Sequence, residues 1–116
     1  MLYINTINCN GLQSHDKIDY LKEVLHDNNV DICLVQETHI DNLVLGNIVE
    51  KRLNYKCFWS LTDNNKHKGV GILISNYLEC KIVNFSFDSF GRYVYVDISL
   101  NDFDIRIVSV YAPNNE

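Results

Sequence analysis

The first part of the chain alternates between extended and helical patterns of apolar residues. Residues 2–8 show a loose strand alternation and end in a turn-forming Asn-Cys-Asn-Gly cluster. Ser14 can cap a helix that begins near His15, along which apolar residues recur at helical spacing until two asparagines close it. Residues 30–36 contain an unbroken apolar run, which is typical of a strand buried on both faces. This order predicts a β-α-β unit with two parallel strands and a right-handed crossover.

The second part of the chain becomes steadily richer in strand patterns. Residues 41–53 suggest a short or irregular helix, and residues 55–60 have strand character. After a polar loop, further strands are predicted over residues 70–75, 78–85, 92–100 and 103–111. The two residues between the last two strands are typical of an antiparallel hairpin. We therefore expect one domain of the α/β (α+β) class, with a mixed sheet and antiparallel hairpins toward the C-terminus.

Length and composition agree with an ordinary soluble domain. The chain has 116 residues, of which 47% are hydrophobic and 22% charged, and a chain of this size can bury a core. No apolar run approaches the roughly 20 residues that a membrane span needs, and no signal peptide is visible at the amino terminus. These features predict an intracellular protein, nuclear or cytoplasmic. The four cysteines form no Cys-x-x-Cys pair, which favours buried free thiols over a zinc site.

The net charge of −5 restricts how this chain could bind nucleic acid. Proteins that grip nucleic acid without sequence preference usually carry a basic face. Two small basic clusters, at residues 51–56 and 66–68, are typical of solvated surface. An acidic chain that binds a phosphodiester needs a metal ion to screen its own carboxylates.

Polar side chains follow three of the predicted strands at the point where each strand ends. Asn8 ends the first strand, Glu37 follows the second, and Tyr111 ends the last. Open α/β sheets bind ligands at the carboxyl ends of their strands. A single carboxylate suits Mg²⁺, which keeps several waters, and an amide and a phenol could orient a phosphate. Each residue also has a structural explanation, as a turn residue, the first solvated residue after a core strand, or a core aromatic.

Taken together, four segments resemble the endonuclease/exonuclease/phosphatase superfamily, and within it the apurinic-like endonuclease domain of non-LTR retrotransposons. The segments are residues 7–12, 35–39, 68–75 and 108–114. The most specific of them contain Gln-Glu-Thr-His at residues 36–39 and Tyr-Ala-Pro-Asn at residues 111–114. The resemblance runs over essentially the whole chain, with the segments in the family's order.

The resemblance implies a fold, an activity and a set of site residues. Members of the superfamily fold as a four-layer α/β/β/α sandwich and hydrolyse phosphodiester or phosphomonoester bonds with Mg²⁺ or Mn²⁺. By this resemblance, Glu37 would be a metal ligand, and Asn10 would lie near the metal. Asn8 would belong to the catalytic pocket around the attacked phosphate, Tyr111 would contact the scissile phosphate, and Asn114 would help to bind the substrate.

The chain also departs from the family pattern. Members continue to a Gly-Asp-Phe-Asn element and end with a Ser-Asp-His element, and neither occurs in this sequence. Residues 1–116 are therefore expected to form the amino-terminal part of such a domain, truncated after Tyr-Ala-Pro-Asn. The missing C-terminal half would be the partner of this chain, and it is expected to supply the second sheet layer. His39 is not carried over as catalytic, because the family's catalytic His lies near the end of the domain.

Three hypotheses about function follow. The first is the amino-terminal part of a Mg²⁺-dependent DNA endonuclease of retrotransposon type, inactive by itself because the general base is absent. The second is a phosphatase or phosphodiesterase of the same superfamily that acts on RNA, an inositol phosphate or a lipid headgroup, which the acidic charge favours. The third is a non-catalytic remnant or interaction module. The sequence does not indicate an oligomeric state.

Overall fold

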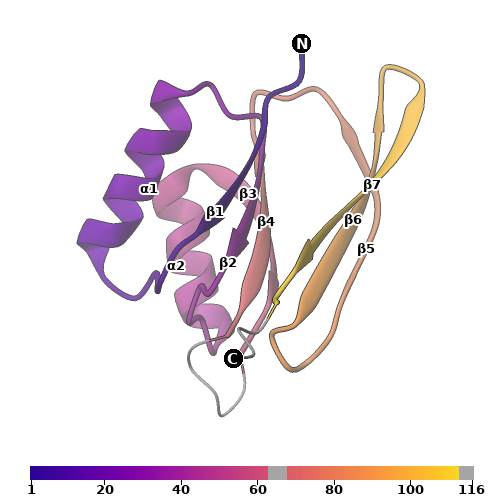
Figure 1. The fold of residues 1–116 in the computed structure, drawn as a ribbon. Coiled ribbons are helices and arrows are strands. Elements are labelled where there is room, and N and C mark those ends of the chain that lie inside the picture. Colours follow the sequence, from indigo (N-terminus) through magenta and orange to yellow (C-terminus); the bar gives the residue numbers. More distant parts are fainter. Residues whose placement is uncertain (63–67, 113–116) are drawn as a thin grey trace.

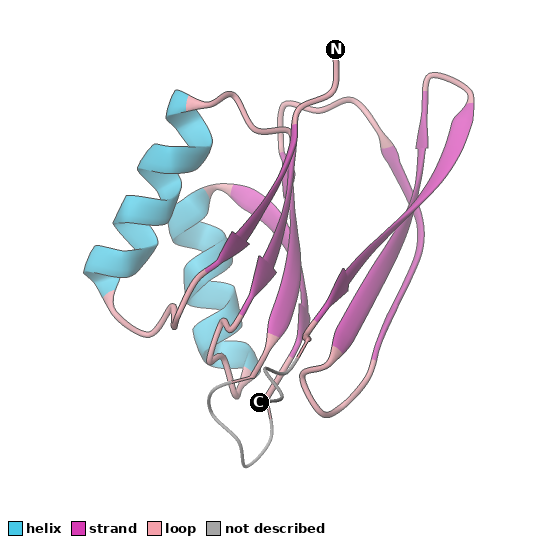
Figure 2. Ribbon diagram, viewed as in Figure 1, coloured by secondary structure: helices cyan, strands magenta, loops and turns pink. Residues whose placement is uncertain are grey.

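The computed structural model describes residues 1–62 and 68–112 and arranges them in three layers (Figure 1). Helices cover one face of a four-stranded sheet, and a three-stranded sheet lies against the other face (Figure 2). The elements are β1 (Ile4–Asn8), α1 (His15–Asp27), β2 (Ile32–Gln36), α2 (Leu43–Leu53), β3 (Tyr55–Ser60), β4 (Val70–Ser75), β5 (Lys81–Phe87), β6 (Tyr93–Leu100) and β7 (Phe103–Val110). The predicted α/β class is confirmed.

The four-stranded sheet has the order β1-β2-β4-β3 and brings the ends of β1 and β2 together. These two strands run parallel, with Ile4 opposite Ile32 and Asn8 opposite Gln36, as the β-α-β order predicts. β4 runs antiparallel to both of its neighbours, β2 and β3. Cys33 and Val35 on β2 are completely buried under the helices, and Ile32 is completely buried against the second sheet.

Both helices have polar caps that the sequence supplies locally. The Ser14 hydroxyl accepts a hydrogen bond from the Lys17 backbone N–H at 3.3 Å, and α1 begins at His15, as predicted. The second helix, expected to be short or irregular over residues 41–53, is instead regular. Its cap is Asn42, whose side-chain oxygen accepts from the Leu45 N–H at 2.9 Å. Neither of these helices, among the described residues, is long and apolar enough to cross a membrane.

The second sheet, with the order β5-β6-β7, corrects one expectation. A missing half of the domain was expected to supply this layer, but residues 81–110 of this chain form it. Val94, Val96 and Ile98 on β6 alternate with outward residues and pack between the sheets. The hairpin between β6 and β7 turns at Asn101 and Asp102, whose φ values of 49° and 68° fit the tight turn that hairpins prefer.

The open edges of the two sheets lie on the same side of the molecule. β3 contacts β5 and β2 contacts β7, so β1 and β7 are the outer strands where the sandwich is open (Figure 1). Apolar side chains are exposed on these strands, including Ile4, Val108 and Val110. Apolar surface therefore remains in contact with solvent along the β1–β7 side of the sandwich.

One end of the sandwich collects the strand ends that the sequence analysis singled out. The arrowheads of β1, β2 and β7 point toward this end (Figure 1). The second basic cluster, at residues 66–68, comes just before β4 in the sequence, and its residues 66 and 67 lie outside the described residues. Of the first cluster, Arg52 pairs with Asp19 at 2.9 Å on the helical surface, as expected of solvated charges.

Candidate active site

The side chains of Asn8 and Glu37 meet at the ends of β1 and β2. The Asn8 amide nitrogen donates a hydrogen bond to the Glu37 carboxylate. Parallel pairing produces this contact, because Asn8 lies opposite Gln36 and Glu37 is the next residue along β2. The carboxylate is half-buried and the amide exposed, so the pair remains open to a ligand from the solvent side.

The backbone at Glu37 turns sharply as β2 ends. Its φ of +51° lies in the left-handed region, which costs a non-glycine residue about 1–2 kcal/mol. Hydrogen bonds on both sides hold this conformation. The Gly11 N–H donates to the Glu37 carbonyl at 2.7 Å, and the Thr38 N–H donates to the Gly69 carbonyl at 3.0 Å. The carboxylate is therefore directed by a backbone that neighbouring loops hold in place.

Asn10 orients the Asn8 amide. The backbone N–H of Asn10 donates to the side-chain oxygen of Asn8 at 3.1 Å, which leaves the nitrogen of that amide to face Glu37. Asn10 itself has a φ of +47°, and its carbonyl accepts a hydrogen bond from the Lys17 ammonium. The predicted role of Asn10 near a metal stays a prediction. Its observed contacts fix the direction of Asn8.

The two remaining candidate residues from the sequence are Tyr111 and Asn114. Tyr111 follows β7, and its backbone N–H donates to the Arg92 carbonyl at 2.7 Å. Its side chain is half-buried and packs against the apolar layer between the sheets. The structure thus places Tyr111 on the sheet opposite Asn8 and Glu37, next to β2. Asn114 lies outside the described residues.

A chain of polar contacts that the sequence analysis missed joins the same three strands. The Thr6 hydroxyl on β1 donates to the side-chain oxygen of Gln36 on β2 at 3.2 Å. The Gln36 amide nitrogen donates to the Ser109 hydroxyl on β7 at 3.4 Å. That hydroxyl in turn donates to the Val35 carbonyl at 3.2 Å. In the sequence, the sign of these contacts was a serine, Ser109, at an inward position within the apolar pattern of the last strand.

Glycines allow the loops around Glu37 to approach one another. Gly69 has a φ of +102°, and a Cβ atom there would come within 2.4 Å of the Thr38 hydroxyl oxygen. Its N–H donates to the Gly91 carbonyl at 3.2 Å, and Gly91 has a φ of +72°. The Lys-Gly-Val-Gly segment therefore starts β4 and supports the Glu37 loop through main-chain contacts.

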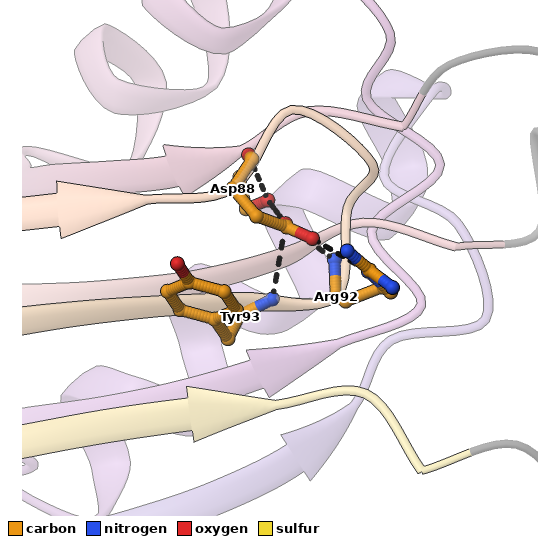
Figure 3. Close-up of polar contacts among 4 residues, drawn as sticks. Asp88, Arg92 and Tyr93 are labelled. Carbon is orange, nitrogen blue, oxygen red and sulfur yellow. Dashed lines mark hydrogen bonds and ion pairs between the residues drawn. The ribbon is translucent and has the colours of Figure 1, made fainter.

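The loop between β5 and β6 is organised by the Asp88 carboxylate (Figure 3). This side chain is 8% exposed and lies 2.7 Å from the Arg92 guanidinium. It also accepts hydrogen bonds from the Ser60 hydroxyl and from the backbone N–H groups of Arg92 and Tyr93. Burial opposes ionisation of this carboxyl, but these hydrogen bonds outweigh it and hold its pKa well below the usual range.

Two cysteines near the site, Cys9 and Cys33, have surroundings that make their thiols unreactive. Burial, the largest effect, raises the pKa of the Cys9 thiol to about 12, although Lys17 acts in the opposite direction. Burial likewise raises the pKa of Cys33 to about 12. Of the four cysteines, which were expected to be buried free thiols, Cys33 is buried and the other three are partly exposed. Thiols with such a high pKa remain protonated at neutral pH and are poor nucleophiles and metal ligands.

The donor set at the strand ends fits a hard cation with few protein ligands. Among residues 1–62 and 68–112, no group of three or more His, Cys, Asp and Glu side chains could enclose a metal. Mg²⁺ requires less, since it is commonly bound by one or two carboxylates and retains several waters. Glu37, with the amide of Asn8 beside it, matches that pattern rather than a transition-metal cage.

An accessible cavity borders the Asn8 side of the pair. Its volume is about 560 Å³, and Asn8, Asn10 and Lys17 line it together with apolar side chains of β1 and α1. This volume lies within the range of ligand sites in proteins. Of the candidate site residues, Asn8 and Asn10 line this cavity, whereas Glu37 and Tyr111 do not.

Comparison with known proteins agrees with this arrangement. Residues 6–115 match the sequence model of the Endonuclease/Exonuclease/phosphatase family. The chain belongs to this family.

Three solved structures of similar fold come from proteins considerably longer than this chain. An AP endonuclease from Archaeoglobus fulgidus is 24% identical with a TM-score of 0.67, and the match covers 97% of this chain and 42% of that protein. AP endonuclease LMAP from Leishmania major is 15% identical with a TM-score of 0.72, covering 97% and 40%. The endonuclease domain of TRAS1, a telomere-specific non-LTR retrotransposon, is 14% identical with a TM-score of 0.64, covering 97% and 45%. The chain spans less than half the length of each.

Proposed function

We propose that this chain provides the metal-binding side of a phosphodiester hydrolase site, in a Mg²⁺- or Mn²⁺-dependent DNA endonuclease of retrotransposon type. The observation that carries the proposal is the contact between the Asn8 amide and the Glu37 carboxylate in a member of this family. The likeness in fold to AP endonucleases and to the endonuclease domain of TRAS1 supports DNA as the substrate of the whole protein.

Each candidate residue has a role that its surroundings allow. Glu37 would hold the cation, which would balance negative charge that develops on the attacked phosphate. Asn8, oriented by the Asn10 backbone, would direct its amide N–H groups toward phosphate oxygens once a cation occupies the carboxylate. The Tyr111 hydroxyl and Asn114 would bind the phosphate or the adjacent strand. Each such contact is stronger in a site where water is largely excluded.

We further propose that the 116-residue polypeptide does not hydrolyse DNA by itself. The family's Gly-Asp-Phe-Asn and Ser-Asp-His elements are absent from the sequence, and these would position and activate the attacking water. Removing a general base typically costs a factor of about 10²–10⁴ in rate. The proposed partner is the C-terminal half of the domain, which would carry these elements and cover the open edges at β1 and β7.

A second candidate function rests on the charge of the chain. A net charge of −5 opposes non-specific binding to long nucleic acids. A small phosphoester, such as an inositol phosphate or a lipid headgroup, would experience less of this repulsion. In that case the same residues would bind the cation and the phosphate, and only the substrate would differ.

Metal binding and catalysis can be tested separately on this polypeptide. Titration with Mn²⁺ should broaden the NMR signals of the Asn8 side-chain amide and the Glu37 backbone amide, and Glu37→Gln should abolish the effect. Glu79→Gln is a matched control, because Glu79 is exposed in the loop before β5. Selective broadening that survives Glu37→Gln would contradict the assigned ligand.

The same samples should be incubated with supercoiled plasmid and Mg²⁺. We expect no nicking by the 116-residue polypeptide. Nicking that is lost in Glu37→Gln would show that residues of this chain activate the water, and the proposed requirement for a partner would then be wrong.

A further inference from the structure

The candidate residues stand on two different sheets, and no strand pairing joins those sheets among the described residues. One backbone hydrogen bond connects the loops in front of β4 and β6, from the Gly69 N–H to the Gly91 carbonyl. Asn8 and Glu37 follow β1 and β2, which are hydrogen-bonded neighbours in the four-stranded sheet. Tyr111 follows β7, whose backbone partner is β6 in the other sheet. A site that uses all three residues therefore requires something to fix the separation of the two sheets at this end.

Apolar packing between the sheets cannot do this with directional accuracy. The interior of the sandwich consists of aliphatic side chains such as Ile32, Ile72 and Val96. Such contacts stabilise the sandwich, but they are non-directional. Productive sites need groups held within about 0.5 Å, which usually requires supporting hydrogen bonds.

At the site end of the sandwich, the Gln36 side chain crosses between the two sheets. Its oxygen accepts from the Thr6 hydroxyl on β1 at 3.2 Å, and its nitrogen donates to the Ser109 hydroxyl on β7 at 3.4 Å. Gln36 directly precedes Glu37, while Thr6 and Ser109 each stand two residues before Asn8 and Tyr111. One amide thus touches all three strands immediately before the residues of the candidate site.

Ser109 is a polar residue at a buried position of β7 where an aliphatic residue would be expected. It is 1% exposed and lies on the inward face of β7, near the aliphatic Ile107. A buried hydroxyl costs free energy unless it is hydrogen-bonded, and this one is satisfied by the Gln36 amide and the Val35 carbonyl. The distance of 3.4 Å to the Gln36 amide lies beyond the usual range of N–H···O bonds, so this contact is weaker than the bond from Ser109 to the Val35 carbonyl at 3.2 Å.

We propose that Gln36 is a positioning residue that sets the separation between the Asn8–Glu37 pair and Tyr111 across the two sheets. This inference rests on the proposed function, in which these three residues act on one phosphate. Gln36 does not itself touch the reacting atoms. Its amide defines how far apart the groups that touch the phosphate are held.

The test uses two variants that break the same contact from opposite sides. Gln36→Leu removes the amide, and Ser109→Ala removes the hydroxyl without changing β2. Tyr111 is observed by ¹⁹F NMR after incorporation of 3-fluorotyrosine, with Tyr111→Phe used to assign its signal. Each single variant should move the Tyr111 signal, and Ser109→Ala should move it further, because it also removes the bond to the Val35 carbonyl. The double variant should add little to Ser109→Ala, because the Gln36–Ser109 contact is already lost there.

Two controls separate positioning from general loosening. Thr6→Val breaks only the arm to β1 and should leave the Tyr111 signal in place. Ile98→Val weakens the apolar packing at the opposite end of β6 and should lower stability without this shift. Equal shifts in all four variants, or additive shifts in the double variant, would overturn the proposal.

Mn²⁺ adds a distance readout and distinguishes this proposal from the proposed function. In the wild-type chain, bound Mn²⁺ should broaden both the Asn8 amide and the Tyr111 fluorine signals. A displacement of about 1 Å, which can cost 100-fold in enzyme rates, should reduce the broadening of Tyr111 about twofold in Gln36→Leu, with Asn8 unchanged. If Mn²⁺ does not bind the wild-type chain, the proposed function fails, and the metal-free ¹⁹F comparison still decides whether Gln36 couples the sheets.

Discussion

The carboxylate of Asp88 lies 2.7 Å from the guanidinium of Arg92, four residues further along the chain. Because this carboxyl is nearly buried and its pKa is lowered, the interaction links stability to pH. A group with a lowered pKa in the folded state stabilises the fold above its unfolded pKa, which is about 3.9, and loses that contribution as the pH falls below it.

We predict that Asp88→Asn lowers the free energy of unfolding at pH 7 by about 2 kcal/mol, as expected when a buried acceptor of charged hydrogen bonds is replaced. The difference from wild type should shrink as the pH falls from about 5 toward 2. Urea unfolding followed by circular dichroism at several pH values would measure this. Asp104→Asn, at an exposed position on β7, is the control, and a difference that does not depend on pH would contradict the prediction.

The close approach of loops at Gly69 leads to a second prediction. Gly69→Ala would place a Cβ atom 2.4 Å from the Thr38 hydroxyl oxygen and would also strain a φ of +102°. We expect a loss of stability of more than about 1 kcal/mol together with displaced amide signals at Thr38 and Glu37.

Gly46→Ala provides the matched comparison for Gly69. This glycine lies in the helix α2, and an added Cβ would meet only the edge of the Trp59 ring, at 3.0 Å. The gain in helix propensity, up to about 1 kcal/mol, should offset that contact. If both variants lose the same stability and neither shifts Glu37, the approach at Gly69 does not support the site.

A third prediction concerns the thiols. With a pKa raised to about 12 at both Cys9 and Cys33, less than about one thiolate in 10⁴ is present at pH 7.5. Iodoacetamide should therefore label these residues far more slowly in the folded chain than in urea, as measured by mass spectrometry of peptides. Rapid labelling of Cys33 in the native state would show that the sheet opens more easily than its burial indicates.

The hairpin between β6 and β7 offers a stabilising change. Asp102 adopts a φ of +68°, which glycine adopts without strain and other residues adopt at a cost of about 1 kcal/mol. Asp102→Gly creates the Asn-Gly pair that this turn favours and should raise the midpoint of thermal unfolding. Asp102→Ala removes the same carboxylate but still strains the positive φ, so it should lower the midpoint of thermal unfolding. If the midpoint changes by the same amount in both variants, the loss of the Asp102 charge is the cause, and the prediction is wrong.

Much of the fold followed from local patterns in the sequence. The expected strands at residues 55–60 and 70–75 coincide with β3 and β4, because turn-forming residues limit both of them. The expected strand at residues 78–85 was placed too early. Leu78 is apolar, but its N–H bonds to the Ser75 carbonyl in the turn after β4, and the strand pairing is irregular between Ile82 and Asn84.

The candidate site was predictable only in part, for a physical reason. Parallel pairing of the first two strands is enough to bring Asn8 beside Glu37, so this contact follows from the β-α-β pattern. The contact between Gln36 and Ser109 spans 73 positions and crosses from one sheet to the other. It depends on which strands of the two sheets face each other, and hydrophobic periodicity does not specify that.

The two outer strands differ in their protection against unwanted pairing. β7 carries Asp104 and Arg106, and Arg106 bonds to Asp97 across the hairpin at 2.7 Å. β1, over Ile4–Asn8, carries no charged residue. Charged side chains discourage another strand from adding to an exposed edge. The isolated polypeptide should therefore self-associate through β1 first, and protein concentration will determine whether monomers or strand-linked oligomers are studied.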